Sequence, residues 1–535
     1  MAMTKEQAFV NGKIFTARDE EEFVTAFKVA NGKITWIGDQ SEIVESDAID
    51  FEERTVLPGF IDIHTHPTYV ATIVNSVPCT VPAVHNIPEM IAALKQHPNF
   101  GKGPNDWIDG FGYDESKLAE HRTPTAVDLD QVSTTQPVYV LRSDCHSGIC
   151  NTRALQIAGI TKDTPDPEGA RFGRFENGEP NGVLEEHAAN DAVLHAKTVA
   201  DYPTKVKSIA ATGRHYNERG IVALTDMMSV ATPFHDLHVY RDAQKQGLRQ
   251  QTSLYFNWLG MKEKPVPDLT DEDRTGSINF AGLKLFADGS VSGKTAWLCE
   301  PYRDSGHGYS TLTDADLEAA YEWTRRNQVQ LAIHAMGDRA LQRVIDFFVD
   351  KEPWLGEHIP SVRLEHATLL NEKQIRQMNN SRMIFGVATQ IIFFFAEHES
   401  YTENLSDDEY RRSYPLKTFY ENIHHLGLSS DAPATTWSDP DNVFVSIKAA
   451  VVRKAYNGAG IVPEQALTVP QAVMLYTARP ATMAPFEGRL GQIAEGFDAS
   501  FIVLDRDIFT VAPDELDRTL VLQTWIQGEK VYERD

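Results

Sequence analysis

The sequence is poor in cysteine and in basic residues, and each deficit excludes a class of protein. Its 535 residues include only four cysteines, Cys79, Cys145, Cys150 and Cys299, and none of them forms a Cys-x-x-Cys pair. So few cysteines argue against a disulfide framework. The 50 Lys and Arg residues are outnumbered by 76 Asp and Glu residues, and the formal net charge is −26. This acidity argues against nucleic-acid and anionic-membrane partners.

Long apolar runs and several catalytic signatures are also missing. The most apolar region, residues 383–396, contains Thr389 and Gln390 and is too short to span a bilayer. Residues 1–7 lack the apolar core of a signal peptide. The chain has neither a Gly-x-Ser-x-Gly elbow nor a phosphate-binding Gly-x-x-x-x-Gly-Lys-Ser/Thr loop. We therefore expect a cytoplasmic protein that acts on a small molecule.

What the sequence does contain is an alternation of strand-like apolar runs with helical patterns. Eight such runs occur, at residues 60–64, 220–226, 251–258, 280–287, 329–334, 362–366, 383–389 and 425–431. Helical patterns separate most of them, and two of these begin with Asp314 and Asp338, residues that suit an N-cap. Eight β/α units predict an α/β fold, a closed parallel (β/α)8 TIM barrel.

Both ends of the chain have the pattern of short strands joined by turns. Asn11-Gly12 and Asn31-Gly32 predict two hairpins near the N-terminus. We expect residues 1–57 and 480–535 to form one small discontinuous β-sandwich domain, because the ends of a domain often lie close together.

The predicted barrel, residues 58–479, contains one interval that is too long for a simple crossover. Residues 68–210 separate the first two barrel strands and carry a strand signal of their own at 136–142. We expect a large insertion after barrel strand one. Since loops at the C-terminal face of such barrels carry function, this insertion is predicted to cap the active site.

Chemically reactive side chains stand at the ends of five predicted strands. They are His64, His66, Lys284, His334, His366 and Asp431. His64 and His66 are two residues apart, so on a strand they face the same side. Each residue alone has an ordinary explanation, such as a hydrogen-bonded histidine, an ion-paired lysine or a helix N-cap. Their joint occurrence on five matching strand ends favours a metal site.

The residue types suit hydrolytic metal chemistry. Imidazole and carboxylate are ligands of Zn²⁺ and similar divalent ions. Burial lowers the pKa of a lysine such as Lys284, and its neutral amine can add carbon dioxide to form a carbamate that bridges two metals. Two metals ~3.5–4 Å apart polarise a carbonyl and generate hydroxide near neutral pH. Asp431 would take the proton from the bridging water and pass it to the leaving group.

Several motifs together resemble the metal-dependent amidohydrolase superfamily, in its family 3 branch, which includes N-substituted formamide deformylases. The motifs are Leu57-Pro-Gly-Phe-Ile-Asp-Ile-His-Thr-His66, Gly282-Leu-Lys-Leu-Phe-Ala-Asp-Gly-Ser290, His334-Ala-Met-Gly-Asp338, Leu364-Glu-His366, Ser430-Asp-Ala-Pro433 and, in the insertion, Asp144-Cys-His-Ser-Gly-Ile-Cys-Asn-Thr-Arg-Ala-Leu155. The resemblance covers nearly the whole chain. It implies a (β/α)8 barrel with a split β-sandwich, and a homodimer.

The resemblance also implies a division of labour within the ligand set. His64, His66 and Asp431 would bind one metal ion, and His334 and His366 would bind the other. Lys284 would bridge the two ions as a carboxylated lysine. One or two ions, with Zn²⁺ the expected metal, would therefore be bound.

Further residues are candidates for contacts with the substrate. His146 is predicted to contact the substrate carbonyl or the leaving group, although Cys145 replaces the glycine of the usual Asp-Gly-His motif. Asp288 and Tyr302 are predicted to bind substrate. The alternatives are that Asp288 only forms part of a turn and that Tyr302 packs in the core. For Arg142 and Arg453, a surface position or structural pairing is favoured over contact with a substrate carboxylate.

These observations lead to one functional hypothesis and two alternatives. We predict a metal-dependent hydrolase that cleaves a C–N bond other than a peptide bond, in an amide or an N-substituted formamide. A metal-dependent lyase, such as a decarboxylase, is possible on the same scaffold, because fold and ligands do not set the reaction. A non-catalytic ligand-binding barrel is disfavoured, since it has no need of the proton carrier Asp431.

Overall fold

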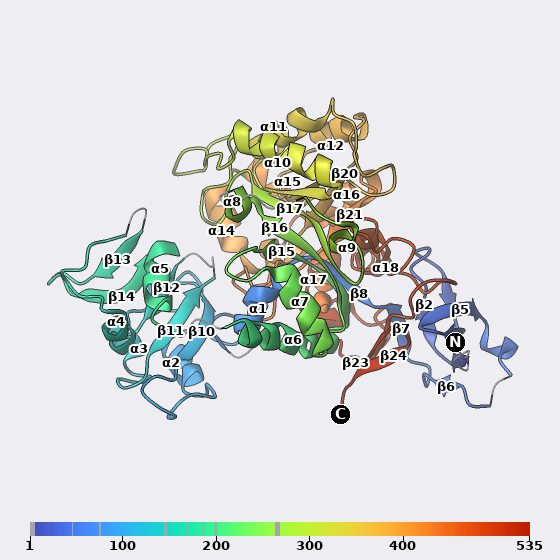
Figure 1. The fold of residues 1–535 in the computed structure, drawn as a ribbon, viewed down its shortest axis with the longest axis horizontal. Helices are drawn as coiled ribbons and strands as arrows, with labels where there is room; N and C mark the ends of the chain where they lie inside the picture. The colour runs from blue at the N-terminus through green and yellow to red at the C-terminus, as the bar shows by residue number, and fades with distance from the viewer. Residues whose placement is uncertain are drawn as a thin grey trace. The chain divides into compact units, whose positions relative to one another are not determined.

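The chain forms two compact units in the computed structural model (Figure 1). The structure describes residues 6–44, 46–73, 76–143, 147–167, 170–185, 187–197, 201–262 and 268–535. The first unit takes in residues 1–66, 209–430 and 441–535, and the second takes in residues 67–208 and 431–440. Each unit has its own sheets and its own apolar core.

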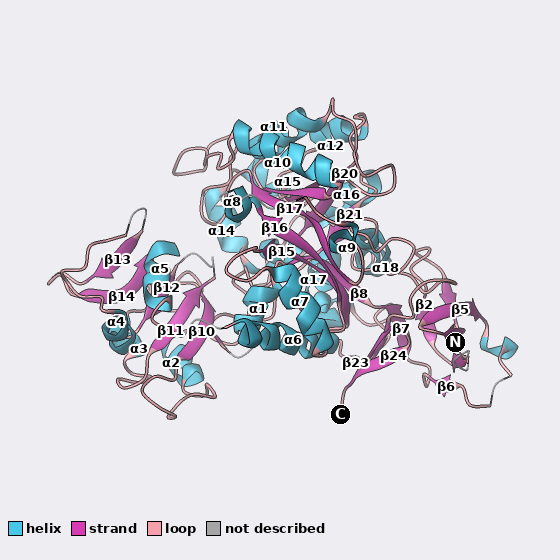
Figure 2. Ribbon diagram, in the orientation of Figure 1, coloured by secondary structure: helices cyan, strands magenta, loops and turns pink. Residues whose placement is uncertain are grey.

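An eight-stranded parallel sheet forms the centre of the first unit (Figure 2). Its strands are β8 (Phe60–Thr65), β15 (Ile221–Ser229), β16 (Gln251–Asn257), β17 (Ile278–Phe286), β18 (Gln330–Ala335), β19 (Val362–His366), β20 (Phe385–Thr389) and β21 (Leu426–Leu428). Their order in the sheet is their order in the sequence, and every neighbouring pair is parallel. The eight predicted strands are therefore confirmed, with the last one shorter than expected.

The two edge strands of this sheet approach each other, so the sheet is nearly closed. β8 and β21 contact each other. Directly after β21, the backbone N–H and the hydroxyl of Ser430 donate to the Asp62 carboxylate of β8, at 3.1 and 2.5 Å. Burial raises the pKa of Asp62 to about 7, even though the Ser430 donors lower it. The sheet fits a TIM barrel, because parallel strands in sequence order curl until the last meets the first.

Helices follow most of the barrel strands. They are α6 (Tyr202–Glu218), α7 (Asp236–Lys245), α8 (Trp258–Lys262), α9 (Asp271–Arg274), α10 (Asp314–Asn327), α11 (Asp338–Phe348), α12 (Glu372–Asn379), α13 (Ile391–Ala396), α14 (His398–Asn404), α15 (Asp407–Arg412), α16 (Leu416–Asn422), α17 (Val443–Val452), α18 (Val469–Met474) and α19 (Ala478–Ala481). Within the described ranges, no helix has both the length and the apolar character that a bilayer crossing requires.

The predicted N-caps of α10 and α11 are wrong by one residue. The caps are Thr313 and Gly337, both with extended backbone, and the Thr313 hydroxyl accepts from the N–H of Asp316. Asp314 and Asp338 are instead the first residues inside the helices. Their negative charge still suits that position, because the helix dipole is positive at its N-terminus.

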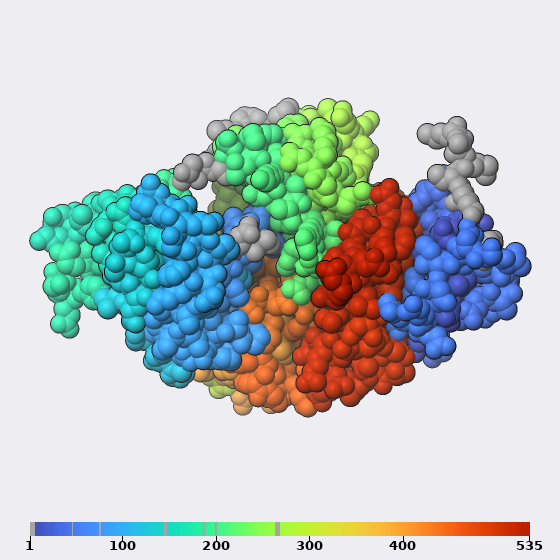
Figure 3. Space-filling model, turned by 90° about the horizontal axis from the view of Figure 1, so that it is seen from below, coloured from blue at the N-terminus to red at the C-terminus, as the bar shows by residue number. Residues whose placement is uncertain are grey.

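Two smaller sheets are built from the ends of the chain, one from N-terminal strands and the other from strands of both ends. One has the order β5-β4-β1-β6 and the other β24-β23-β22-β7-β2-β3. Their strands are β1 (Gln7–Val10), β2 (Lys13–Phe15), β3 (Phe23–Val24), β4 (Ala26–Ala30), β5 (Lys33–Gly38), β6 (Ile49–Asp50), β7 (Thr55–Pro58), β22 (Phe501–Leu504), β23 (Val521–Ile526) and β24 (Glu529–Glu533). N-terminal β7 pairs with C-terminal β22, and the two ends of the chain lie side by side in Figure 3. The domain boundaries given above stay a prediction.

One apolar cluster joins these two sheets. Phe9 and Phe27 from the N-terminal strands stack at 4.9 Å between ring centroids. Phe501 and Trp525 from the C-terminal strands stack at 5.4 Å and meet Phe9 edge-on. Aromatic rings bury large areas in such arrangements, so the two ends of the chain stabilise each other.

One of the two predicted hairpins is confirmed. Asn31 and Gly32, with φ of 53° and 75°, connect the antiparallel strands β4 and β5, as a type I′ turn requires. The hairpin at Asn11-Gly12 is wrong, because β1 and β2 belong to different sheets. There the turn moves the chain from one sheet to the other, which lets β1 pair with β4 while β2 pairs with β7.

The second unit is built on a mixed six-stranded sheet of order β13-β14-β12-β11-β10-β9. Its elements are α1 (Pro67–Ile73), β9 (Val77–Pro78), α2 (Ile87–Leu94), β10 (Ile108–Tyr113), α3 (Ala126–Leu129), β11 (Val138–Arg142), β12 (Gly148–Cys150), α4 (Thr152–Ala158), β13 (Arg171–Arg174), β14 (Pro180–Glu185) and α5 (His187–Leu194). Two apolar clusters stabilise it, one with Met90 and Val140 and one with Leu155 and Leu184. Its predicted role as a cap stays a prediction.

A buried histidine at the start of β21 makes the stability of the first unit depend on pH. Burial lowers the pKa of His425 from 6.5 to about 4, and the neighbouring His424 contributes. His425 therefore binds a proton more tightly in the unfolded chain than in the folded one. The stabilisation is complete above pH 6.5 and is lost as the pH falls towards 4.

We expect His425→Gln to reduce this dependence. Between pH 7.5 and 4.5, the free energy of unfolding of the wild type should fall by ~2–3 kcal/mol more than that of the variant. Urea unfolding at the two pH values measures this. A control variant, His307→Gln at an exposed position, should keep the wild-type dependence; equal losses in all three proteins would contradict the assignment.

Candidate metal centre

The barrel brings the predicted histidines and lysine together at the C-terminal ends of its strands. His64 and His66 come from the end of β8, Lys284 from β17, His334 from β18 and His366 from β19. The ring centroids of His64 and His366 are 4.8 Å apart, and those of His334 and His366 are 4.3 Å apart. The Lys284 Nζ lies 3.4 Å from the His64 Nε2. Parallel strands explain this convergence, because all their carboxyl ends meet at one edge.

The sixth predicted ligand, Asp431, directly follows Ser430, the residue that is hydrogen-bonded to Asp62 of β8. One carboxylate oxygen of Asp431 and one ring nitrogen from each of His64 and His66 lie within 4.8 Å of one another. Ligands of a divalent ion at about 2.0–2.2 Å from the metal have such separations. Two neutral imidazoles and one carboxylate therefore fit a Zn²⁺-like ion.

His64 is held by a buried carboxylate on β19. The His64 Nδ1 lies 2.6 Å from the Glu365 Oε2, and both side chains are fully buried. A carboxylate accepts hydrogen bonds, so the Nδ1 of His64 carries the hydrogen. The lone pair of the ring is then on Nε2, the nitrogen that faces Lys284. An outer carboxylate that orients a ligating histidine is a common arrangement in metal sites.

Glu365 keeps its negative charge because of Arg363. Burial by itself would raise the pKa of Glu365, but Arg363, His64 and Lys284 together lower it to about 2. The Arg363 Nε donates to the Glu365 Oε1 at 2.8 Å, and its Nη2 donates to the Ile63 carbonyl at 2.7 Å. Its Nη1 donates to the Tyr255 hydroxyl at 2.9 Å. The buried ion pair on β19 thus has hydrogen-bond partners on two other barrel strands, β8 and β16.

His366 and His334 are oriented by a side-chain amide and a backbone carbonyl, and the Asp288 carboxylate also lies 3.6 Å from the His334 Nε2. The His366 Nδ1 donates to the Gln390 side-chain oxygen at 2.8 Å, and the Gln390 amide donates in turn to Ser429 at 2.8 Å. The His334 Nε2 donates to the Gly289 carbonyl at 3.0 Å. By these bonds, the lone pairs are on Nε2 of His366 and on Nδ1 of His334. The two rings can therefore act as neutral ligands.

The structure gives different surroundings to the predicted substrate-binding residues. The Asp288 carboxylate accepts three backbone N–H bonds, from Trp297, Met336 and Gly337, at 2.8–3.0 Å. Burial raises its pKa to about 7. The buried Tyr302 hydroxyl donates to the Ala296 carbonyl at 2.9 Å. Both residues thus shape the loop after β17, and their contact with a substrate stays a prediction. His146 lies outside the described residues.

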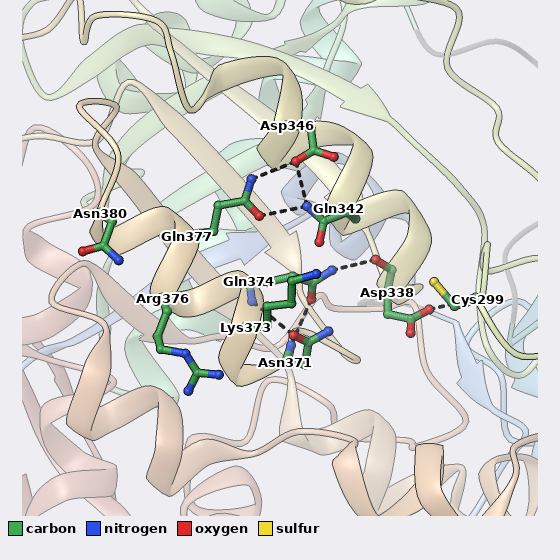
Figure 4. A pocket seen from close by; sticks show the side chains of 10 residues that line it. All are labelled: Cys299, Asp338, Gln342, Asp346, Asn371, Lys373, Gln374, Arg376, Gln377 and Asn380. Carbon is green, nitrogen blue, oxygen red and sulfur yellow. Dashed lines mark hydrogen bonds between the residues drawn. The ribbon is translucent and has the colours of Figure 1, made fainter.

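A surface cavity of about 880 Å³ lies elsewhere, between α11 and α12 (Figure 4). None of the metal-site residues lines it. Its polar groups bond to one another: the Gln342 amide donates to Asp346 and Gln377, and Gln377 donates to Asp346, at 2.7–2.9 Å. The metal centre, rather than this cavity, is the candidate active site.

The sequence reasoning did not assign roles to Arg363, Glu365 and Gln390. A signal was present for the first two, since they are charged residues in a strand whose five residues are all buried. A charge in a buried parallel strand needs a partner. Gln390 had no such signal. It follows β20, and it reaches His366 because β20 lies beside β19 in the sheet.

The amidohydrolase family profile matches residues 47–532 of the chain. One relative, the N-substituted formamide deformylase of Arthrobacter pascens, is 25% identical over 548 residues, with 100% of this chain and 99% of the relative covered. Crystal structures of uncharacterized metal-dependent hydrolases from Pyrococcus horikoshii OT3 and Pyrococcus furiosus share the fold. Their TM-scores are 0.74 and 0.72 at 24% and 23% identity, with 95% of this chain and 99% and 100% of those chains covered. The chain therefore belongs to the amidohydrolase family, a family of enzymes that hydrolyse C–N bonds.

Proposed function

We propose that this enzyme hydrolyses linear amides and that N-substituted formamides are among its substrates. The observation that carries the proposal is the convergence of four histidines and Lys284 on the carboxyl ends of the barrel strands. The formamide substrate class is supported by the relative from Arthrobacter pascens, which is named as a deformylase of N-substituted formamides.

The residues of the site would divide the work between binding and orientation. His64, His66 and Asp431 would hold one divalent ion, and His334 and His366 a second. When bound, such an ion supplies a Lewis acid that polarises a carbonyl and lowers the pKa of a water molecule. Glu365, Gln390 and the Gly289 carbonyl set the tautomers of three of the histidines, so their lone pairs are available without rearrangement.

Lys284 would act as a carbamate. Its neutral amine adds to carbon dioxide, forming an N–C bond and releasing one proton. The product carries two carboxylate oxygens in place of one ammonium. We infer this from its burial among His64, Phe286 and Glu365: the ammonium contacts the Nε2 edge of His64 at 3.4 Å and the Phe286 ring at 5.1 Å. A carbamate would offer oxygen ligands to a metal ion, whereas an ammonium has no lone pair to offer.

Asp431 would carry the proton. Its carboxylate takes a proton from the attacking water molecule and delivers it to the nitrogen of the leaving amine. The hydrogen bonds from Ser430 to Asp62 anchor the residue directly before Asp431.

The proposed reaction can be tested with a panel of N-substituted formamides, other linear amides and carboxylic acids. We expect amine and carboxylate release from the amides, loss of activity after chelation, and recovery when Zn²⁺ or Mn²⁺ is added. Carbon dioxide release from the acids without amide cleavage would identify a lyase instead. Full activity in metal-free protein would overturn the metal-dependent mechanism.

Asp431→Asn should lower turnover by at least ~100-fold, the usual contribution of a positioned acid-base group. The amide cannot accept the proton, yet it has the size of the carboxylate. Steady-state kinetics, together with metal analysis and circular dichroism, separates loss of chemistry from loss of metal or fold. Asp350→Asn, at an exposed position, is the control. Near-wild-type turnover in Asp431→Asn would exclude Asp431 as the proton carrier.

Glu365→Gln should weaken metal binding ~10- to 100-fold, because His64 loses its charged acceptor. It should also lower the free energy of unfolding by ~3–5 kcal/mol, since Arg363 stays buried without its counter-charge. Chelator competition measures the first effect and urea unfolding the second. Glu357→Gln, at an exposed position, should change neither. An unaltered metal affinity would show that Glu365 does not orient His64.

A further inference from the structure

Arg453 is a fully buried arginine that forms no ion pair with any of the described residues. It ends α17 and has 0% exposure. Its Nε donates to the Ile461 and Val462 carbonyls, at 2.7 and 3.1 Å. Its two terminal nitrogens, Nη1 and Nη2, are buried and have no hydrogen-bond partner among the described residues.

Within the part of the chain that the structure describes, no carboxylate is hydrogen-bonded to Arg453. The guanidinium carbon lies 5.8 Å from the centre of the Phe394 ring on α13. Tyr410 of α15 packs on the same ring at 5.1 Å, and its hydroxyl donates to the Gly460 carbonyl. Glu464 is exposed to solvent and only moderates the effect of burial, which lowers the pKa of Arg453 to about 9. Arg142 differs, because it is paired with Glu115 at 2.9 Å.

The terminal N–H groups of Arg453 have the geometry of an anion-binding site. A guanidinium offers five N–H groups in a planar fork that matches a carboxylate. Among the described residues, only the Nε–H of Arg453 has a hydrogen-bond partner. Buried charges are stable when they are paired. We propose that the terminal nitrogens of Arg453 bind a small monoanion, a carboxylate or a halide.

One short helix, α13, contacts both Arg453 and a residue of the candidate metal centre. Phe393 and Phe394 are consecutive residues of α13: the Phe393 ring stacks on the metal-site residue His366 at 6.0 Å, and the Phe394 ring contacts Arg453. Two sources of the anion follow from this position. It is a free ion from solution, or it is a carboxylate group of the substrate.

Free anions are tested without substrate. Thermal unfolding of the full-length wild type is followed in sodium bromide, chloride and formate against sodium gluconate at constant ionic strength. Crystals soaked in bromide are examined for an anomalous peak beside Nη1 and Nη2. A saturable rise in Tm and a bromide peak identify a free ion. Arg453→Met should lose the Tm response, and Arg142→Met, the matched control, should keep it.

The substrate carboxylate is tested by kinetics, and this second measurement rests on the amide hydrolysis proposed above. If the substrate supplies the anion, Arg453→Met should raise the KM at least tenfold for amides that carry a carboxylate, while the kcat/KM for matched uncharged amides and the metal content stay unchanged. Should Arg453→Met fail to fold, Arg453→Lys and the bromide-soaked wild-type crystals decide. No bromide peak, no anion-dependent Tm and no selective change in KM would overturn the proposal, whatever the outcome for metal-dependent hydrolysis.

Discussion

The buried ion pair between Arg363 and Glu365 is the interaction on which the metal centre depends. A carboxylate without a partner would be protonated in so buried a place, and a neutral acid would orient His64 poorly. Arg363 makes the largest contribution against burial, and together with His64 and Lys284 it lowers the pKa of Glu365 to about 2. Since Arg363 also binds Ile63 and Tyr255, the charge that orients the ligand is held by the barrel wall itself.

The barrel supplies the second requirement, which is convergence. Its parallel strands bring residues that are up to about 300 positions apart to one edge of the sheet, as in the contact between His64 and Glu365. Short loops could not hold several neutral imidazoles with their lone pairs facing one point. Gln390, Gly289 and Glu365 achieve this from strand ends and from the loops that follow them. The same edge carries α13, whose consecutive phenylalanines connect the metal centre with Arg453.

Where local signals failed, tertiary partners explain the result. Asn11-Gly12 has the composition of a hairpin turn, yet β1 and β2 pair with strands of different sheets because the apolar side chains of both join one cluster. Asp314 and Asp338 suit an N-cap, but Thr313 and Gly337 adopt the extended backbone before the helices. Arg453 was expected at the surface or paired within the chain, and its buried terminal nitrogens have no partner among the described residues.

The sequence by itself determined the eight parallel strands and the identity of the ligand candidates at their ends. It could do so because apolar periodicity is local and because metal chemistry restricts the useful side chains to a few types. Only the tertiary structure decided which nitrogen carries the proton in His64, His334 and His366, that Glu365 remains charged, and that the buried Arg453 has no carboxylate partner among the described residues. These properties depend on contacts between residues far apart in the chain, and no local pattern records them.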